Sequence, residues 1–472
     1  MAVYKCEVCD TVYDEEKEDV KWDDLPDNWI CPVCGSGKSY YKLVQDVAVI
    51  PDTSDTPGYR DESWRTSELE GYMADIHKIS ETGDSIIEPM RTERPTFSWD
   101  EILIKGAQLA KIPLNYDEPV NTKTIIGPKA RKPMVIDTPI YITHMSFGAL
   151  SREVKIALAK GSAAAKTAMC SGEGGILPES MENAYKYIFE YVPNKYSVTG
   201  DNLKRVDAIE IKIGQSVKPG MGGYLPAEKV TKEIAKIRGV NEGFDIISPS
   251  NFEDIKNRDD LKKKVEWLRN TSDGRPIGIK FAAGNIEADL EVALYAEPDF
   301  ITIDGCPGGT GAAPKFIKAA TSVPSIFALY RAGKFLKERG VTDVSLVITG
   351  GLRISSDFAK ALALGADAVA IGTSALMACG CQQYRICNTG RCPTGITTQD
   401  PELREMCNID ESAKRLENFL RVSTEELKDF ARLTGNNNVH GLSIDDLCTT
   451  NSEISNHTEI EHVSGERGYK RA

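Results

Sequence analysis

The sequence predicts an α/β protein, a (β/α)8 barrel that follows a small metal-binding domain. Short apolar strand candidates alternate with amphipathic helices over about 250 residues, the usual length of one such barrel. Continuous apolar strands separated by helices are typical of a parallel sheet buried on both faces. Ahead of this region, the first 34 residues hold two Cys-x-x-Cys pairs, whose thiolates can surround one metal ion.

Composition excludes several classes of protein. The chain has 472 residues, 41% hydrophobic and 27% charged, which is near the globular average and excludes wholesale disorder. Acidic residues outnumber basic ones, 70 to 57, so the chain is poorly suited to nucleic acid. No apolar run approaches the roughly 18–20 residues of a membrane helix, and the N-terminus lacks an apolar signal segment. We therefore expect a cytoplasmic protein without disulfides.

Four cysteines define the first domain, expected at residues 1–45. They are Cys6, Cys9, Cys31 and Cys34. Four thiolates bind zinc or iron, so a structural zinc ribbon is the alternative. The segment contains Tyr4, Tyr13 and Trp29, which are more aromatic side chains than a small zinc ribbon usually has.

Both cysteine loops resemble those of rubredoxins, in residues 4–14 and 27–35. The resemblance implies a rubredoxin-like domain with a single Fe(Cys)4 centre that carries one electron at a time. The domain has ten Asp and Glu against five Lys, which suits a basic redox partner.

Residues 46–135 are rich in proline and show little periodicity. Residues 46–60 are typical of a linker. Residues 99–109 are predicted to form a helix with Ser98 as its N-cap. We expect the segment to wrap the barrel and see no chemistry in it.

The barrel domain is expected at residues 136–400. Its predicted strands are 139–145, 168–171, 208–213, 244–248, 277–281, 300–304, 345–349 and 368–371. Its predicted helices are 151–166, 226–238, 259–270, 286–296, 313–337 and 355–364. The second unit is irregular, with a helix at about 180–190. An open doubly wound sheet is the alternative, but its Gly-x-Gly-x-x-Gly fingerprint is missing.

Glycines follow the last two predicted strands, where barrels often hold phosphate. Gly350, Gly351 and Arg353 follow the seventh strand, and Gly372 and Thr373 follow the eighth. Glycines let backbone N–H groups approach a phosphate closely. No P-loop motif is present, so a flavin mononucleotide phosphate fits best.

Three lysines at strand ends indicate negatively charged ligands. Lys212, Lys218 and Lys280 follow apolar strands. A buried ammonium is costly unless it is paired, so these are rarely packing residues. They predict an anionic cofactor and an anionic substrate.

A second cysteine group occupies residues 379–392. Cys381, Cys387 and Cys392-Pro393 have the uneven spacing of an iron–sulfur motif. Buried inert cysteines are the alternative. Cys379 could be a fourth ligand, but it is only two residues from Cys381, which favours a cluster on three cysteines.

Together these motifs resemble the FMN-binding synthase domain of glutamate synthases over residues 100–400, most closely the stand-alone archaeal type. The motifs are Met145-Ser-Phe-Gly-Ala-Leu-Ser151, Gly172-Glu173-Gly174-Gly175, Lys212-x-x-Gln215-x-x-Lys218-Pro-Gly, Gly308-Gly-Thr-Gly-Ala-Ala-Pro314 and Gly350-Gly-Leu-Arg353. The resemblance implies FMN, a [3Fe-4S] cluster on Cys381, Cys387 and Cys392, and reductive amination of 2-oxoglutarate through 2-iminoglutarate.

The resemblance also implies roles for individual residues. Catalytic residues would be Glu173, Lys212, Gln215, Lys218 and Arg238. Cofactor-binding residues would be Met145, Ser146, Lys280, Gly308, Gly309, Thr310, Gly350, Gly351, Arg353, Gly372 and Thr373. For Arg238, near a helix end, a surface ion pair is the alternative.

Departures from the family keep other functions open. The chain begins with the rubredoxin-like domain where a glutaminase domain is expected, so ammonia would come from solution or from a separate subunit. Pocket positions carry Met221, Tyr224 and Phe252-Glu253 instead of the family's residues. The alternatives are amine transfer as in N-methylglutamate synthase, a flavin oxidoreductase on another keto or amino acid, and an electron-transfer subunit. Assembly as a homo-oligomer is open.

Electrons would pass from an external donor, such as a ferredoxin or a rubredoxin reductase, through the rubredoxin iron and the [3Fe-4S] cluster to FMN. Residues 401–472 are expected to be a helical extension. Two helices are predicted at 409–434, with Ser423 as a cap, and the last twenty residues are expected to be loose or to clasp a neighbour.

Overall fold

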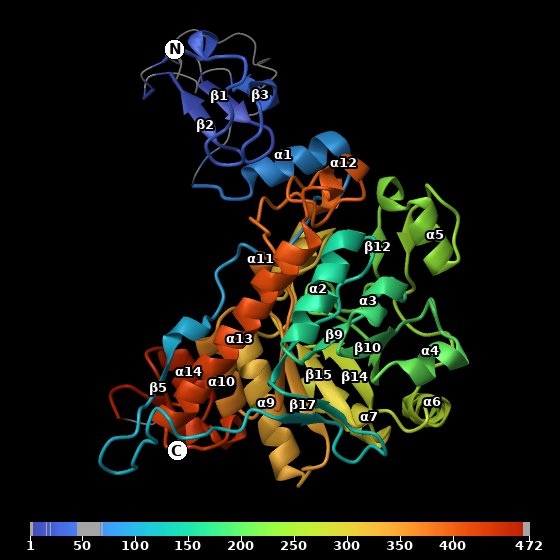
Figure 1. Ribbon diagram of the computed structural model, residues 1–472, viewed down its shortest axis with the longest axis vertical. Coiled ribbons are helices and arrows are strands. Elements are labelled where there is room, and N and C mark those ends of the chain that lie inside the picture. Colours follow the sequence, from blue (N-terminus) through green and yellow to red (C-terminus); the bar gives the residue numbers. More distant parts are fainter. Residues whose placement is uncertain (1–2, 16, 19, 45–66, 68, 466–472) are drawn as a thin grey trace. The chain divides into compact units, whose positions relative to one another are not determined.

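The computed structural model describes residues 3–465, except 16, 19, 45–66 and 68 (Figure 1). The chain divides into two compact units, Met1–Ile86 and Ile87–Ala472. The predicted linker at 46–60 and the end of the predicted loose tail lie outside the described residues. In the part that is described, no helix is both long and apolar enough to cross a membrane.

The first unit is a small antiparallel sheet that packs on aromatic side chains. Its strands are β1 (Val3–Cys6), β2 (Val12–Asp14) and β3 (Tyr41–Val44), in the order β2-β1-β3. Trp22 is buried against Tyr4, with ring centroids 4.3 Å apart, and against Tyr13 and Tyr41. The helix α1 (Met73–Thr82) follows and ends at Gly83 in the left-handed conformation. A core this small buries little apolar surface, so we expect the unit to need further stabilisation.

The second unit is built on a closed barrel of eight parallel strands, which confirms the predicted fold class. The strands are β8 (Ile140–Ile142), β9 (Ala168–Cys170), β10 (Lys186–Tyr191), β11 (Ala208–Lys212), β14 (Ile277–Ala282), β15 (Phe300–Asp304), β17 (Ser345–Thr349) and β18 (Ala368–Ile371). Pairing of β18 with β8 closes the ring. The strands are almost wholly buried, as expected for a sheet covered by helices.

Helices cover the outside of the barrel (Figure 1). They are α2 (Arg152–Ala164), α3 (Pro178–Glu182), α4 (Gly200–Arg205), α6 (Arg258–Thr271), α7 (Ile286–Tyr295), α9 (Ser325–Glu338), α10 (Ser355–Ala363) and α11 (Thr373–Ala378). The long α13 (Ile409–Leu433) lies along α2. Gly161 on α2 allows α13 to pack this closely, since a Cβ at that position would lie only 2.7 Å from the Ala413 carbonyl oxygen.

One predicted strand was wrong. The third barrel strand is β10, whereas an irregular helix was predicted at 180–190. The sequence of β10, Lys-Tyr-Ile-Phe-Glu-Tyr, is rich in residues that favour strands. Residues 244–248 instead contribute β13 (Ile246–Ile247), which pairs with β12 (Tyr224–Leu225) in an insertion between β11 and β14. The insertion also contains α5 (Lys232–Arg238).

Four predicted helices also differ. The helix predicted at 226–238 is a 3-10 turn (Ala227–Lys229) followed by the shorter α5. Ser98 caps only a short 3-10 turn (Trp99–Glu101), which continues as β5 (Ile102–Ile104). The 313–337 helix divides into β16 (Ala313–Pro314), α8 (Lys315–Ala320) and α9, because Pro324 interrupts it. The two helices predicted at 409–434 are the single α13, with Ser423 buried in its middle.

Segments on either side of the barrel sequence close one end of it. The hairpin of β6 (Thr124–Ile126) and β7 (Met134–Ile136) packs its apolar face on Phe300 and Ala368, at the starts of their strands.

The remaining short elements are β4 (Ile87–Glu88), α12 (Pro401–Arg404), β19 (Leu447–Thr449), α14 (Ser452–His457) and β20 (Glu461–His462). The opposite end, at the carboxyl ends of the strands, is the one that holds a cavity.

Candidate active site and metal centres

A cavity of about 300 Å³ lies at the carboxyl ends of the barrel strands. Among the residues that line it are all those predicted to bind substrate or cofactor, namely Met145, Ser146, Glu173, Lys212, Gln215, Lys218, Arg238, Lys280, Gly308, Gly309, Thr310, Gly350, Gly351, Arg353, Gly372 and Thr373. The structure thus brings together residues from seven strand ends and from the insertion. Their individual roles stay predictions.

A buried ion pair lies in this cavity. Lys212, the last residue of β11, donates to Glu173 Oε2, and the Gly223 amide donates to Glu173 Oε1 over 3.2 Å. Burial acts to raise the pKa of Glu173, but the charge of Lys212 lowers it to about 2. Burial likewise acts to lower the pKa of Lys212, and Glu173 outweighs it. Both groups are therefore charged at neutral pH.

Arg238 ends α5 and points its guanidinium inward. Arg238 is only 8% exposed. Its Nη2 donates to the Phe147 carbonyl over 2.7 Å, and its guanidinium lies 5.5 Å from the Tyr196 ring centroid. The surface ion pair considered from the sequence is thus wrong. Within the described residues, Arg238 Nε is buried without a hydrogen-bond partner. A buried N–H group of this kind suits a carboxylate ligand.

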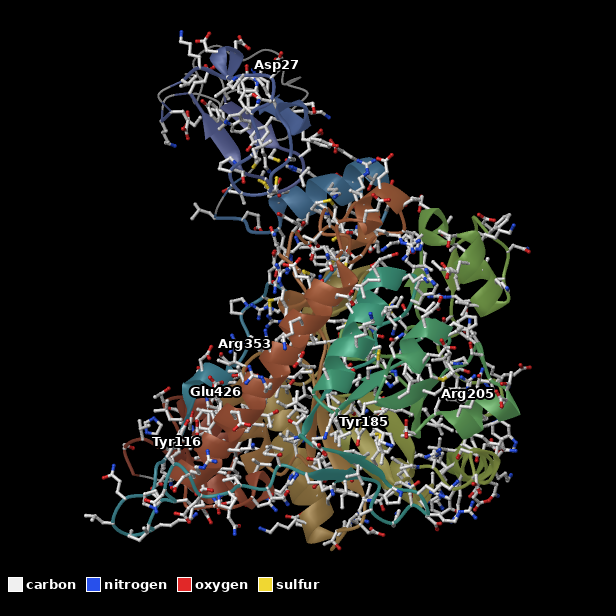
Figure 2. All side chains as sticks on the ribbon, in the orientation of Figure 1. Asp27, Tyr116, Tyr185, Arg205, Arg353 and Glu426 are labelled. Carbon is white, nitrogen blue, oxygen red and sulfur yellow. The ribbon has the colours of Figure 1, made fainter. Side chains whose placement is uncertain are left out.

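The opposite side of the cavity is a glycine-lined turn. Gly350 has φ +108°, and a Cβ on it would overlap the Gly305 carbonyl, so the turn requires glycine. Nearby, the first backbone amides of α11, from Thr373 on, have no acceptor within the helix. Arg353 (labelled in Figure 2) bonds Asp100 over 3.0 Å and Asp357 over 3.2 Å, so its charge is already balanced.

Three titratable residues beneath the cavity, His144, Glu190 and Glu210, were not predicted from the sequence, whereas their neighbour Lys280 was. Lys280 Nζ is 3.6 Å from Asp304, and although burial acts to lower the pKa of Lys280, Asp304, Glu190 and Glu210 raise it above its ordinary value. His144 lies between Glu190 and Glu210. Glu210 could have been found, because it is two residues before Lys212 on one strand and faces the same side. Glu190 was hidden by the wrong assignment of β10.

The segment that precedes the barrel also reaches the cavity, although no chemistry was expected of it. Met90 and Arg91 are among the lining residues. The Met90 amide donates to the Thr310 carbonyl over 2.6 Å. This backbone bond holds the segment against the loop that follows β15.

The four N-terminal cysteines form a metal site. The thiols of Cys6, Cys9, Cys31 and Cys34 all lie within 4.8 Å of one another. Cys6 and Cys31 are buried, which limits the access of water. Four converging thiolates suit a tetrahedral iron or zinc ion.

The second cysteine group borders the cavity. Cys381 and Cys387 line it, and burial together with Cys387 and Cys392 raises the pKa of Cys381 to about 11. Cys381, Cys387 and Cys392 are not among the described residues whose ligand atoms lie close enough to hold one metal ion, so the cluster on these three cysteines stays a prediction.

A closed barrel with a charged cavity at its carboxyl end defines a (β/α)8 enzyme, joined here to a four-cysteine metal domain. Residues 89–437 match the conserved region in glutamate synthase, and residues 3–41 match rubredoxin. The chain belongs to the glutamate synthase family, as an oxidoreductase with an additional rubredoxin domain.

Curated relatives agree with this placement. A glutamate synthase large subunit-like protein of Rhizobium meliloti is 36% identical over 81% of this chain and 91% of its own length. Archaeal glutamate synthase [NADPH] of Methanocaldococcus jannaschii is 35% identical over 80% of this chain and 81% of its own length. Solved structures that match include a mandelate oxidase variant, with 16% identity, a TM-score of 0.49, and coverage of 74% of this chain and 88% of that one.

Proposed function

We propose that the protein reductively aminates 2-oxoglutarate with ammonia to give glutamate, using FMN. The observation that carries the proposal is the grouping of Lys212, Lys218 and Arg238 around Glu173 in one open cavity. Three cations around one carboxylate leave a net positive site, which suits a dicarboxylate. An occluded cavity would instead have favoured a pure electron-transfer subunit.

FMN fits the features of the cavity. Glycines and helix-start amides border one side, where a phosphate can approach the backbone. Met145 and Ser146 would contact the ring system, and Lys280 would stabilise negative charge on it. The phosphate would lie against Gly350, Gly351, Gly372 and Thr373. When bound, FMN supplies hydride to the substrate carbon.

The chain's own groups would bind and activate the keto acid. Arg238 would bind one carboxylate through its unpartnered Nε, and Lys218 would neutralise the other. Lys212 would polarise the keto oxygen. When Lys212 turns to the substrate, Glu173 loses its main partner, and its pKa rises from about 2 toward its ordinary range. Glu173 could then accept a proton from ammonium or from the carbinolamine on the way to 2-iminoglutarate.

Electrons would enter one at a time. The Cys6, Cys9, Cys31 and Cys34 iron would receive them from an external partner such as a ferredoxin or a rubredoxin reductase. A [3Fe-4S] cluster on Cys381, Cys387 and Cys392 would pass them to the flavin, since two of these cysteines border the cavity. Ammonia would come from solution or from a separate subunit.

Isotope labelling tests this function. The reduced holoenzyme, given 2-oxoglutarate and ¹⁵N-ammonium, is expected to form ¹⁵N-glutamate, detected by mass spectrometry. N-methylglutamate formed with methylamine, and no glutamate with ammonium, would instead establish the alternative amine transfer.

Binding of 2-oxoglutarate should weaken as pH rises above about 8. Burial and repulsion from Lys212 lower the pKa of Lys218 to about 8, so below that pH Lys218 is charged and above it the charge is lost. If only the charged form binds, Kd rises about tenfold per pH unit. Lys218→Arg, which stays charged, should remove this rise when Kd is read from flavin absorbance. The same rise in Lys218→Arg would contradict the assignment.

Gly350→Ala should weaken FMN binding by at least about tenfold, because the left-handed backbone strain and the overlap with Gly305 together cost more than about 1.4 kcal/mol. The recovery of free FMN fluorescence on dilution measures the affinity. Gly365→Ala is the matched control, since Gly365 has φ +100° but open space around a Cβ. Equal FMN loss in both variants would show that strain alone, and not the cavity turn, is responsible.

A further inference from the structure

A bound FMN would bring a phosphate into the cavity, and that phosphate needs a counter-charge. This step rests on the FMN of the proposed function. Glycines and backbone amides let a phosphate approach closely, but they carry no net charge. The neighbouring Arg353 is already paired, 3.0 Å from Asp100 and 3.2 Å from Asp357. A further cation is therefore required on this side of the cavity.

One lining cation is still available. Seven lysines and arginines line the cavity, and six of them already face acidic or carbonyl groups. Besides Arg353, these six are Lys212, Lys218, Lys229, Arg238 and Lys280. The seventh is Arg91, whose guanidinium has no ion pair or hydrogen bond within the described residues.

Arg91 belongs to a strap, residues 87–93, that is fixed on the segment following β15. The β4 strand of the strap pairs with β16 of that segment. Lys318 Nζ is 3.1 Å from Glu88 Oε2, and the lysine side chain is only 1% exposed. The Met90 amide donates to the Thr310 carbonyl over 2.6 Å. These contacts fix the backbone on one side of Arg91.

The loop of the second cysteine group holds the strap as well. Arg385 Nη2 donates to the Arg91 carbonyl over 2.8 Å, and Arg385 Nε is 3.1 Å from Glu93 Oε1. Met90 has φ +64°, a left-handed conformation that a residue other than glycine keeps only where its surroundings hold it. The backbone of Arg91 is thus fixed, while its charged group remains available to a ligand.

The strap passes close to the turns expected to hold phosphate. The Arg91 amide nitrogen and the Thr373 hydroxyl lie 3.8 and 3.2 Å from the point where a Cβ on Gly309 would stand. Because residue 309 is glycine, no side chain fills that point. The same loop reaches the turn after β17, since a Cβ on Gly351 would lie 2.7 Å from Pro307 Cδ. Arg91 therefore starts within side-chain reach of this side of the cavity.

We propose that Arg91 binds the FMN phosphate, so that the strap completes the cofactor site. Its planar guanidinium donates two parallel hydrogen bonds to phosphate oxygens and supplies the charge that the glycine turns lack. Arg91 thereby makes the site selective for FMN over riboflavin, which has the same ring system without the phosphate.

A comparison of FMN with riboflavin isolates this contact. Full-length protein is loaded with either flavin, and the free flavin fluorescence recovered on dilution gives each Kd. In Arg91→Gln, the Kd of FMN should rise at least about tenfold, the usual effect of losing a charge-assisted hydrogen bond. The Kd of riboflavin should not change. Arg91→Lys keeps the charge without the planar fork, so the Kd of FMN should rise less.

Arg94→Gln is the matched control. Arg94 lies one residue beyond the strap, donates to the Ala319 carbonyl over 3.2 Å and is not among the lining residues, so both Kd values should stay as in the wild type. An equal rise for both flavins in Arg91→Gln, or an unchanged Kd of FMN, would overturn the proposal. Flavin binding without glutamate formation would refute the proposed function and leave this result intact, whereas a wild type that binds neither flavin would overturn both.

Discussion

Lys212→Met should lower the rate of glutamate formation by about 10²–10³-fold, the usual effect of removing one group that stabilises developing charge. Lys212 is the partner of buried Glu173 and, in the proposed function, the cation that polarises the keto oxygen. Without it, burial raises the pKa of Glu173, and the site loses both its polarising charge and its carboxylate. Single-turnover reoxidation of reduced flavin measures the loss.

A double variant separates chemistry from stability. Removing one partner of a buried pair leaves an uncompensated charge, which can destabilise a protein by about 3–5 kcal/mol. Glu173→Gln combined with Lys212→Met removes both charges and should restore the free energy of unfolding without restoring the rate. A double variant that regains activity would show that Lys212 only stabilises the fold.

Cys9→Ser should abolish the reduction of flavin by an external donor while chemically reduced flavin still reacts with substrate. Cys9 is one of four thiolates around a single ion, and its loss opens the site and shifts or expels the iron. Flavin absorbance under a donor such as reduced ferredoxin measures delivery. Cys448→Ser, at a cysteine outside both groups, is the control. Unchanged delivery in Cys9→Ser would show that electrons bypass the rubredoxin domain.

The barrel was predictable because its signal is local. Buried parallel strands are continuous apolar runs, and seven of the eight predicted strands belong to the barrel. The exception, β10, carries Lys186 and Glu190 within an otherwise apolar run, because Glu190 serves the barrel interior. Charge inside a strand weakens the apolar pattern at the point where function requires it.

The site was only partly predictable for a related reason. The resemblance to glutamate synthases predicted residues that line the cavity, including Glu173 and Arg238. The pairing of His144 with Glu210 depends on the register of strands far apart in sequence. Nothing in the local sequence of residues 87–91 indicated that they reach the loop after β15.

The most direct test of the central claim is a stopped-flow measurement on anaerobically reduced protein. Reduced enzyme is mixed with 2-oxoglutarate alone, with ammonium alone, or with both, and flavin absorbance is followed. The account predicts rapid reoxidation only when both are present, with one glutamate formed per flavin reoxidised. Reoxidation that needs neither, or none with both present, would contradict the claim that this cavity aminates 2-oxoglutarate.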